Sequence, residues 1–369
     1  MHELLCPTCN TAGQYDLADY LLFCTFCSTT FKVDLETGKK EIYGDHYIVA
    51  NTIDARRAKE LVLEWLRRLH HKPGSADKEH VIIDIHGLSL PFWVVSTEVH
   101  TLWKGLVRRH KRSQLEHVPG SEYLMENGQF RRSYRWAISG RKNICESWGM
   151  IRLHEPKESV GVDWDGFPLD STFSRGRIDE NSSDKSVYEV REFFEFKYSN
   201  GLPIIGVQVN EQDALHRAQT HLQQYHYRLA QLNVDYLIEC RTEVDIAGIQ
   251  LIHLPFWFAR YVYQPRSALR HVYKPAEKNA ILDGFGTGLL KGELALVRND
   301  KIWINSIICG IATLFMLIMG AVWHPAFFLV AFFGVCVTVA SMLIAGSKSQ
   351  KEEIGAKDPG LSGNQKVAT

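Results

Sequence analysis

The hydrophobic pattern of this chain is most pronounced near its C-terminus. Residues 302–322 contain no charged side chain, and a second uncharged run continues after the turn Trp323-His324-Pro325 as far as Gly346. About 20 helical residues at roughly 1.5 Å each match the roughly 30 Å hydrocarbon core of a bilayer. The two runs therefore predict an antiparallel two-helix transmembrane hairpin over residues 302–346. A buried hairpin inside a soluble core is the alternative, although core helices of this length normally have a polar face.

Basic residues flank the predicted hairpin on both sides. Arg298 and Lys301 precede it, Lys348 and Lys351 follow it, and the turn between the helices has neither Lys nor Arg. Because cytoplasmic loops carry the excess of positive charge, both chain termini are expected in the cytoplasm. This predicts a protein of the cytoplasmic (inner) membrane with two spans, for which the lipid bilayer is a partner.

Upstream of these runs the periodicity alternates between helix-like and strand-like segments. Residues 54–72 predict a helix that Asn51 or Asp54 can cap and that Pro73-Gly74 ends. Strands are expected at residues 81–85 and 88–99. A second helix is expected to open at residues 207–214 and to run to about Gln231.

The same order of segments occurs twice. Leu90-Pro91-Phe92-Trp93 is repeated as Leu254-Pro255-Phe256-Trp257, and Ile83-Asp84-Ile85-His86-Gly87 is echoed by Val244-Asp245-Ile246-Ala247-Gly248. We therefore expect two copies of a helix-plus-strands unit, packed as related halves. The Pro-Phe-Trp segments could form a peptide groove or a core contact between sheet and helix, and the frequent burial of Phe and Trp favours the core.

A long, irregular β-rich insertion separates the two copies. Asn127-Gly128 predicts a hairpin turn, and residues 134–138 predict a further strand. Residues 104–142 carry ten basic and three acidic side chains, whereas residues 155–195 carry eleven acidic and five basic ones. Two solvated faces that neutralise one another are the favoured interpretation. A basic surface held against anionic lipid headgroups is the alternative.

Composition narrows the class of protein. Lys plus Arg equals Asp plus Glu at 42 each in 369 residues. This balance argues against a general nucleic-acid binder held by phosphate charge. The first residues lack the basic flank and long apolar core of a secretory signal. Four of the eight cysteines are gathered near the N-terminus, a pattern of a reducing compartment and not of a disulfide framework.

The N-terminal cysteines have the spacing of a metal site. Cys6-Pro7-Thr8-Cys9 and Cys24-Thr25-Phe26-Cys27 are two C-x2-C pairs separated by fourteen residues. Two such knuckles can close a tetrahedral shell of four thiolates around one Zn²⁺, with Cys6, Cys9, Cys24 and Cys27 as ligands. A closed shell leaves no position for water, so the zinc is expected to be structural and to replace a core that so short a segment cannot build. Redox pairing of the same thiols is the lesser alternative.

Together these segments predict an α+β chain. We expect seven parts: a zinc ribbon at 1–40, a first α+β repeat at 41–105, the β-rich insertion at 106–200, a second repeat at 201–280, a flexible connector at 281–301, the transmembrane hairpin at 302–346 and a disordered tail at 347–369.

These motifs, in this order, resemble a family of poorly characterised bacterial membrane proteins that contain a transcription-factor-IIB-type zinc ribbon. The resemblance is carried by the four cysteines, the helix with Trp65, the two Pro-Phe-Trp segments, the strand at residues 134–140 and the terminal apolar segment. The chain departs from the family at Asn10 and Ser28, where the family usually has Gly at the knuckles, and in having two clear spans. The resemblance implies a non-enzymatic membrane component, sometimes linked with envelope-stress proteins of the phage-shock or flotillin-like kind. Some members are labelled replication-restart helicases, but this chain has no Walker loop.

The function that these predictions favour is a membrane-anchored cytoplasmic zinc-binding adaptor or scaffold that recruits or regulates another protein. It needs no catalytic residue and no cofactor other than zinc. An enzyme acting at the membrane surface is one alternative, but His216, His221 and His226 are spaced by five residues and do not share a helix face. Nucleic-acid binding is the other alternative, and the acidic residues of the ribbon argue against it. The sequence does not identify the protein partner or a small ligand, and it leaves a homo-oligomer open.

Overall fold

The computed structural model of the chain describes most of its N-terminal three quarters. The described residues are 2–34, 36–69, 80–110, 121–142, 166–170, 186–263, 276–285 and 289–292, with single helical positions at 311, 315 and 318. Two compact units divide the chain: residues 1–61, 85–259 and 280–291 form the first, and residues 62–84, 260–279 and 292–369 form the second. The four cysteines and both Pro-Phe-Trp segments belong to the first unit.

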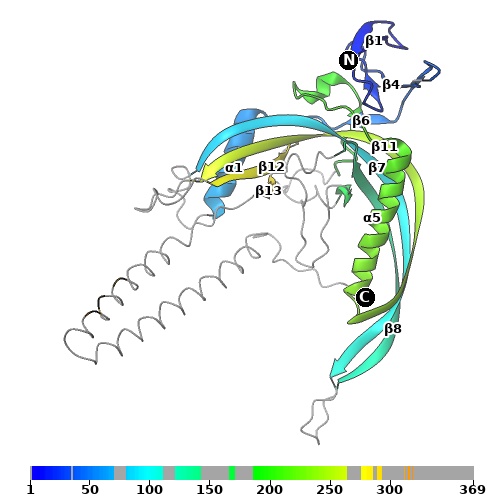
Figure 1. Ribbon diagram of the computed structural model, residues 1–369, viewed down its shortest axis with the longest axis vertical. Coiled ribbons are helices and arrows are strands. Elements are labelled where there is room, and N and C mark those ends of the chain that lie inside the picture. The colour runs from blue at the N-terminus through cyan, green and yellow to red at the C-terminus, as the bar shows by residue number, and fades with distance from the viewer. Residues whose placement is uncertain are drawn as a thin grey trace, which may run out of the picture. The chain divides into compact units, whose positions relative to one another are not determined.

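The described residues form mainly β structure, so the expected α+β fold class is wrong (Figure 1). The α-helices with described bounds are α1 (Ala55–Leu69) and α5 (Glu211–Gln231), and a short 3-10 helix lies at Phe196–Ser199. The strands are β1 (His2–Leu5), β2 (Ala12–Tyr15), β3 (Leu22–Phe23), β4 (Thr30–Val33), β5 (Lys40–Ile42), β6 (His46–Ile48), β7 (His80–His110), β8 (Ser121–Ser139), β9 (Phe167–Pro168), β10 (Glu192–Phe193), β11 (Tyr236–Tyr263), β12 (Ala276–Asp283) and β13 (Leu289–Gly292).

One sheet is built around three long strands, β7, β8 and β11. Its order is β10-β6-β11-β7-β8-β9; β12 joins it by pairing with β11, and β13 pairs with β12. β7 and β8 pair antiparallel without interruption from Phe92 opposite Ser139 to His110 opposite Ser121. β6 lies parallel to β11 and antiparallel to β10.

The two expected helix-plus-strands units do not form. β7 and β11 each follow a helix, but they are neighbours in a single sheet. The backbone N–H of Asp235 donates to the carbonyl of Leu106. At the other end of β7, a Cβ built on Gly87 would lie 3.0 Å from the Trp257 ring, so the two strands run in opposite directions. The expected boundary at residue 105 therefore falls inside β7, and β8, which was assigned to the insertion, is a central partner of the sheet.

The hairpin turn expected at Asn127-Gly128 is also absent from the described strand β8. Asn127 pairs with Lys104, and Gly128 pairs with Trp103, inside the β7–β8 ladder. A Cβ on Gly128 would lie 2.2 Å from the indole of Trp103. Gly128 therefore makes room for this indole, which is a common reason for a glycine inside a strand.

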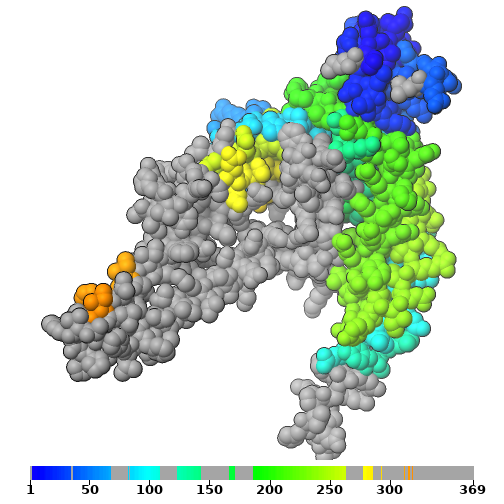
Figure 2. Space-filling model, viewed as in Figure 1, coloured from blue at the N-terminus to red at the C-terminus, as the bar shows by residue number. Residues whose placement is uncertain are grey.

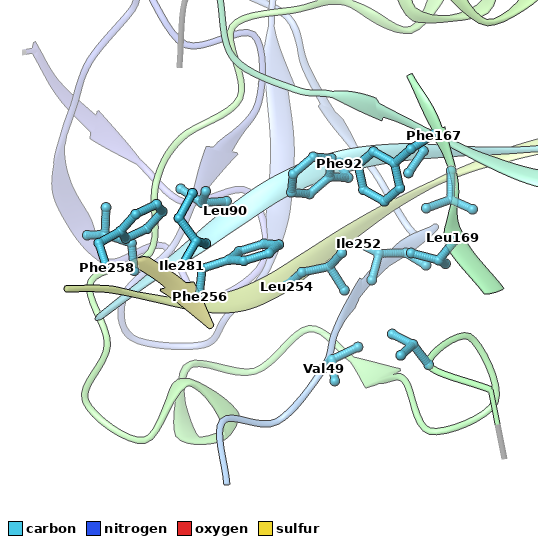
Figure 3. Packing of buried hydrophobic residues seen from close by; sticks show 14 residues of the cluster. Val49, Leu90, Phe92, Phe167, Leu169, Ile252, Leu254, Phe256, Phe258 and Ile281 are labelled. Atoms are coloured by element: carbon cyan, nitrogen blue, oxygen red, sulfur yellow. The ribbon is translucent and has the colours of Figure 1, made fainter. Parts of the chain in front are cut away.

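The sheet of the first unit buries apolar side chains on both faces. Because successive strand residues point to opposite faces, Phe92 and Trp93 belong to two different clusters. On one face the Phe92 ring lies 5.5 Å from Phe167 and 5.9 Å from Phe256 (Figure 3). On the other face α5 packs Ala214, Ala218 and Leu222 into a cluster with Trp93 and Trp136. The core interpretation of the Pro-Phe-Trp segments is therefore confirmed.

The described helices start where capping chemistry predicts. Asp54 accepts a 2.7 Å hydrogen bond from the backbone N–H of Arg57 at the start of α1. Asn210 does the same for Asp213 at the start of α5, at 2.7 Å. Side-chain oxygens at these positions satisfy N–H groups that have no partner within the helix. The two predicted helices are therefore confirmed to within a few residues.

In the part of the chain that the structure describes, no helix is both long enough and apolar enough to cross a membrane. The prediction of a two-span inner-membrane protein with a C-terminal helical hairpin is therefore not supported. The prediction was based only on the length and hydrophobicity of uncharged runs in the sequence. Among the described helices, α1 carries the charged residues Arg56, Arg57 and Glu60, which make it unsuited to the hydrocarbon of a membrane. The expected hairpin at 302–346, apart from the three positions named above, and the tail at 347–369 lie outside the described residues.

Candidate metal centre

The ribbon is made of two small β-sheets, each of which carries one C-x2-C knuckle. β1 and β2 flank the first knuckle, and β3 and β4 flank the second, with β5 added beside β4. The two knuckles close with the same backbone hydrogen bonds. Asn10 donates to the carbonyl of Cys6 at 3.1 Å, and Ser28 donates to the carbonyl of Cys24 at 2.9 Å. Each knuckle therefore lies between the two strands of a short antiparallel pair.

Both knuckles need a left-handed residue after the second cysteine. Asn10 has φ 59° and Ser28 has φ 60°, both in the left-handed region that favours Gly. Asn adopts this region more readily than Ser. Ser28 makes a further contact, because its hydroxyl accepts a 3.3 Å hydrogen bond from the backbone N–H of Phe196.

The four cysteine sulfurs lie close enough to bind one ion. All four Sγ atoms are within 4.8 Å of one another, and the Cys6–Cys27 and Cys9–Cys24 pairs are each 3.6 Å apart. Zn–S bonds of about 2.3 Å in a tetrahedron place the sulfurs roughly 3.8 Å apart. Cys6 and Cys24 are buried, and Cys9 and Cys27 are partly exposed. The predicted ligand set is therefore brought together in one place, where it can hold a metal ion.

Two threonines that the sequence analysis missed contact the cysteine sulfurs. The Thr11 hydroxyl lies 3.4 Å from Cys9 Sγ, and the Thr29 hydroxyl lies 3.2 Å from Cys27 Sγ. The hydrogen bond with Thr11 lowers the pKa of the Cys9 thiol to about 6. Burial has the opposite effect on Cys24 and raises its pKa to about 11. The repeated pattern Cys-x-x-Cys-x-Thr was visible in the sequence and could have identified both threonines.

The opposed shifts have a chemical consequence. A metal ion requires all four thiols to lose their protons, so binding depends on pH. The lowered pKa of Cys9 favours its thiolate, whereas burial raises the pKa of Cys24 and favours its protonated thiol. The arrangement therefore favours a closed structural site in which the cation compensates the buried negative charge.

The ribbon is fixed to the sheet of the first unit. Tyr20 donates a 2.5 Å backbone hydrogen bond to Val207, and Leu21 forms a bridge with the same residue. Arg141 pairs with Asp19 at 2.8 Å. Burial raises the pKa of the Asp19 carboxyl in spite of this arginine. Figure 2 shows the ribbon, in blue, against green residues of the same unit.

A buried chain of polar groups joins the ribbon to the sheet. The Thr30 hydroxyl of β4 lies 2.5 Å from Nδ1 of His46, and Nε2 of His46 lies 2.8 Å from Nδ1 of His253. Nε2 of His253 lies 2.9 Å from the carbonyl oxygen of Ile205, so this nitrogen must carry a proton. The direction of the other bonds follows: His46 donates to His253, and Thr30 donates to His46.

Both imidazoles in this buried chain of polar groups are neutral. Burial lowers the pKa of His253 to about 4 and moves the pKa of His46 well below its usual value. The Phe194 ring stacks on His46 at 3.9 Å, and Phe23 of the ribbon packs beside both imidazoles. His253 is therefore a structural residue of the sheet. His46 had no sequence signal, because 207 positions separate it from its partner.

The three helix histidines do not come together. His216 is exposed, whereas His226 is fully buried between the Thr101 hydroxyl at 2.7 Å and the Tyr134 hydroxyl at 2.9 Å. Burial lowers the pKa of His226 to about 4. An open cavity of about 520 Å³ lies at the start of α1, and none of these histidines lines it. The acidic group in this cavity, Asp54, caps α1.

Comparison with known proteins gives no relative for this chain. No protein-family model matches it, and neither the curated proteins nor the solved structures contain a match. The resemblance to zinc-ribbon membrane proteins therefore stays a prediction from sequence. The functional argument depends on the geometry of the cysteine site and of the surface around it.

Proposed function

We propose that this protein is a zinc-dependent adaptor, in which the metal-bound ribbon presents an apolar surface to another protein. The observation that carries the proposal is the exposure of large apolar side chains on the ribbon. Phe26 is 77% exposed, and Leu5 and Ile42 are 47% and 58% exposed. Large apolar side chains exposed to this degree commonly mark an interaction surface.

The metal ligands hold part of this surface together. Leu5 immediately precedes Cys6, and Phe26 immediately precedes Cys27. The sulfurs of these two cysteines are 3.6 Å apart. Loss of the metal would release the two knuckles from each other, so binding of the partner is expected to require the metal.

Zinc is the metal that suits this ligand set best. Four thiolates in a tetrahedral arrangement are typical of structural Zn²⁺ sites. Metal analysis of the purified full-length chain should give one zinc per chain. A variant with Cys9→Ser and Cys27→Ser should give none, and iron in place of zinc would contradict the assignment.

The adaptor proposal is tested through Phe26. Proteins that copurify with the tagged full-length chain are compared between wild type and Phe26→Ser, and each candidate partner is purified and its direct binding measured. Phe26→Ser should weaken binding at least tenfold, because it removes an exposed aromatic anchor without touching the core. Tyr236→Ser is the matched control, since Tyr236 is 59% exposed but lies in β11 and outside the ribbon.

Two outcomes would contradict the proposal. One is equal binding of every purified partner by wild type and Phe26→Ser. The other is unchanged binding after zinc has been removed and its absence verified. Zinc content and thermal stability of both variants are measured first, so that misfolding is not mistaken for loss of a contact.

A further inference from the structure

Tyr15 lies among the metal ligands although it is not one of them. It is the last residue of β2, in the sheet that carries the first knuckle, and it is only 7% exposed. It packs in one cluster with Cys6 and Cys24, one cysteine from each knuckle. The other members of this cluster are apolar side chains and cysteines. Buried hydroxyl groups are normally hydrogen-bonded, so the neighbours of the Tyr15 oxygen show what this tyrosine does.

Two contacts fix the direction of the Tyr15 ring. The ring meets Phe31 of β4 edge to face, with the ring centroids 5.5 Å apart. It also lies over Gly13, where a Cβ would come within 2.7 Å of the phenol oxygen. Gly13 therefore leaves room for the ring, as a glycine inside a strand often does. The hydroxyl points back along β2 toward the first knuckle.

The hydroxyl of Tyr15 meets a sulfur of the opposite knuckle. It lies within hydrogen-bond reach of Cys24 Sγ, and the sulfurs of Cys6 and Cys9 are close enough to act on it electrostatically. Cys24 Sγ is in turn 3.6 Å from Cys9 Sγ. Tyr15 thus belongs to the sheet of the first knuckle but contacts a ligand of the second.

Hydroxyl groups surround the ligand set. Thr11 and Thr29 place a hydroxyl beside the second cysteine of each pair. Of the two first cysteines, Cys6 accepts from a backbone N–H of its own knuckle, whereas Cys24 also has the Tyr15 hydroxyl in reach. Cys24 is only 2% exposed, so water cannot solvate its sulfur. A buried thiolate depends on protein donors of this kind.

We propose that Tyr15 is a positioning residue of the metal centre, whose hydroxyl donates to the Cys24 thiolate in the metal-loaded ribbon and ties the first knuckle to the second. A thiolate accepts a stronger hydrogen bond than a neutral thiol, so this contact strengthens when the metal binds. The ligand shell stays four sulfurs. The inference rests on the metal site of the proposed function and does not depend on the partner surface.

Tyr15→Phe isolates the hydroxyl, because it keeps the ring against Phe31 and removes only the oxygen. Loss of a hydrogen bond to a ligand commonly weakens metal affinity by roughly 10- to 100-fold, so zinc should bind this variant about tenfold more weakly. Competition with a chelating indicator at one fixed pH measures the affinity of the full-length chain. Tyr20→Phe is the matched control, since it removes the same oxygen from a ribbon tyrosine that packs against Trp93 of the sheet.

Cobalt provides a readout that a merely structural role would not move. Co²⁺ bound by four thiolates has sulfur-to-metal charge-transfer bands, and a hydrogen bond to a sulfur raises their energy because it stabilises the electrons of that sulfur. The bands of cobalt-loaded Tyr15→Phe should therefore lie at longer wavelength than those of wild type and Tyr20→Phe. Gly13→Ala displaces the phenol oxygen, so it should shift the bands in the same direction. It should add little to the shift when combined with Tyr15→Phe.

The outcomes separate this proposal from the adaptor function. A folded Tyr15→Phe with the bands and the zinc affinity of wild type would overturn the role of Tyr15, and so would an equal shift in Tyr20→Phe. Neither result concerns the adaptor, because the spectra are recorded without a partner. If Tyr15→Phe does not fold, Gly13→Ala decides, and unshifted bands in that variant overturn the proposal. A wild-type chain that binds neither zinc nor cobalt would overturn the metal assignment and this proposal together.

Discussion

At the residue scale, the metal site depends on hydrogen bonds that surround the ligands as well as on the ligands. Cys-x-x-Cys spacing predicted the four sulfurs, and the geometry brings them together. The two threonines add hydroxyls that stabilise thiolates, and they occupy equivalent places in the two knuckles. Substitution of such surrounding groups commonly weakens metal affinity by roughly 10- to 100-fold.

Thr11→Val should weaken zinc binding by roughly tenfold. The change keeps the shape of the side chain but removes the hydroxyl that lowers the pKa of Cys9. Protons then compete with zinc at higher pH, so the midpoint of zinc release on acidification should move upward. A zinc-indicator titration of the released metal measures it. Thr8→Val is the control, because Thr8 is exposed and contacts Cys6 only through its backbone N–H. Equal midpoints in the two variants would contradict the role given to Thr11.

The buried imidazoles make stability depend on pH. His253 has a pKa of about 4 in the folded state, below its value of about 6.5 in an unfolded chain. The unfolded chain therefore takes up the proton first, so stability is complete above pH 6.5 and falls as pH decreases from 6.5 to 4. The loss is on the order of 3 kcal/mol at pH 4 for this residue.

His253→Gln should flatten this pH dependence. A glutamine can donate to the Ile205 carbonyl and accept from His46, but it does not titrate. Urea unfolding at a series of pH values between 4 and 7 measures the free energy of unfolding. His216→Gln is the control, since His216 is exposed and should keep the wild-type slope. His46 and His226 also have lowered pKa values, so part of the slope should remain in His253→Gln. A wild-type slope in His253→Gln would be the contrary result.

At the element scale, the sequence predicted helices well and strand lengths poorly. Both helices have capping residues that act locally, and local chemistry is readable in sequence. The 31-residue strand β7 contains Gly87, Pro91 and Gly105, which are residues typical of strand ends. Gly87 and Gly105 instead accommodate close neighbours, Leu202 and Val234 respectively. Such contacts depend on residues far away in the sequence, so the local pattern placed the boundaries wrongly.

Gly128→Ala should destabilise the fold by about 1–3 kcal/mol, the usual cost of overpacking. The new methyl group would lie 2.2 Å from the ring of Trp103, and both residues are held by the β7–β8 ladder. Gly248→Ala is the matched control, because a Cβ at Gly248 meets nothing within 4 Å. Replacing a glycine by alanine at such an open position should leave the free energy of unfolding unchanged or raise it by up to about 1 kcal/mol. Urea midpoints compare the two variants, and equal midpoints would show that Trp103 moves aside freely.

At the scale of the first unit, the ribbon and the sheet form one body. The sequence predicted the ribbon as an independent segment ending at residue 40, because its cysteines are self-sufficient as ligands. The residues that bind it to the sheet are scattered along the chain: Asp19 with Arg141, Leu21 with Val207, and His46 with His253. No local pattern marks such pairs. The similar segments around the two Pro-Phe-Trp motifs suggested two separate repeats. They are instead parts of adjacent strands, β7 and β11, and adjacent strands of one sheet can share a local sequence pattern.

Removal of zinc should therefore destabilise the sheet as well as the ribbon. A four-cysteine ribbon loses its fold without metal. Its unfolding would withdraw Tyr20 from Trp93, whose ring centroids are 6.4 Å apart, and would expose Leu21 of the sheet core. We expect a strong chelator to lower the melting temperature of the sheet, followed by tryptophan fluorescence, by several degrees. Arg141→Met, which removes the ion pair with Asp19, should make this difference smaller because the ribbon then supports the sheet less. An identical sheet transition with and without zinc would mean that the ribbon and the sheet unfold independently.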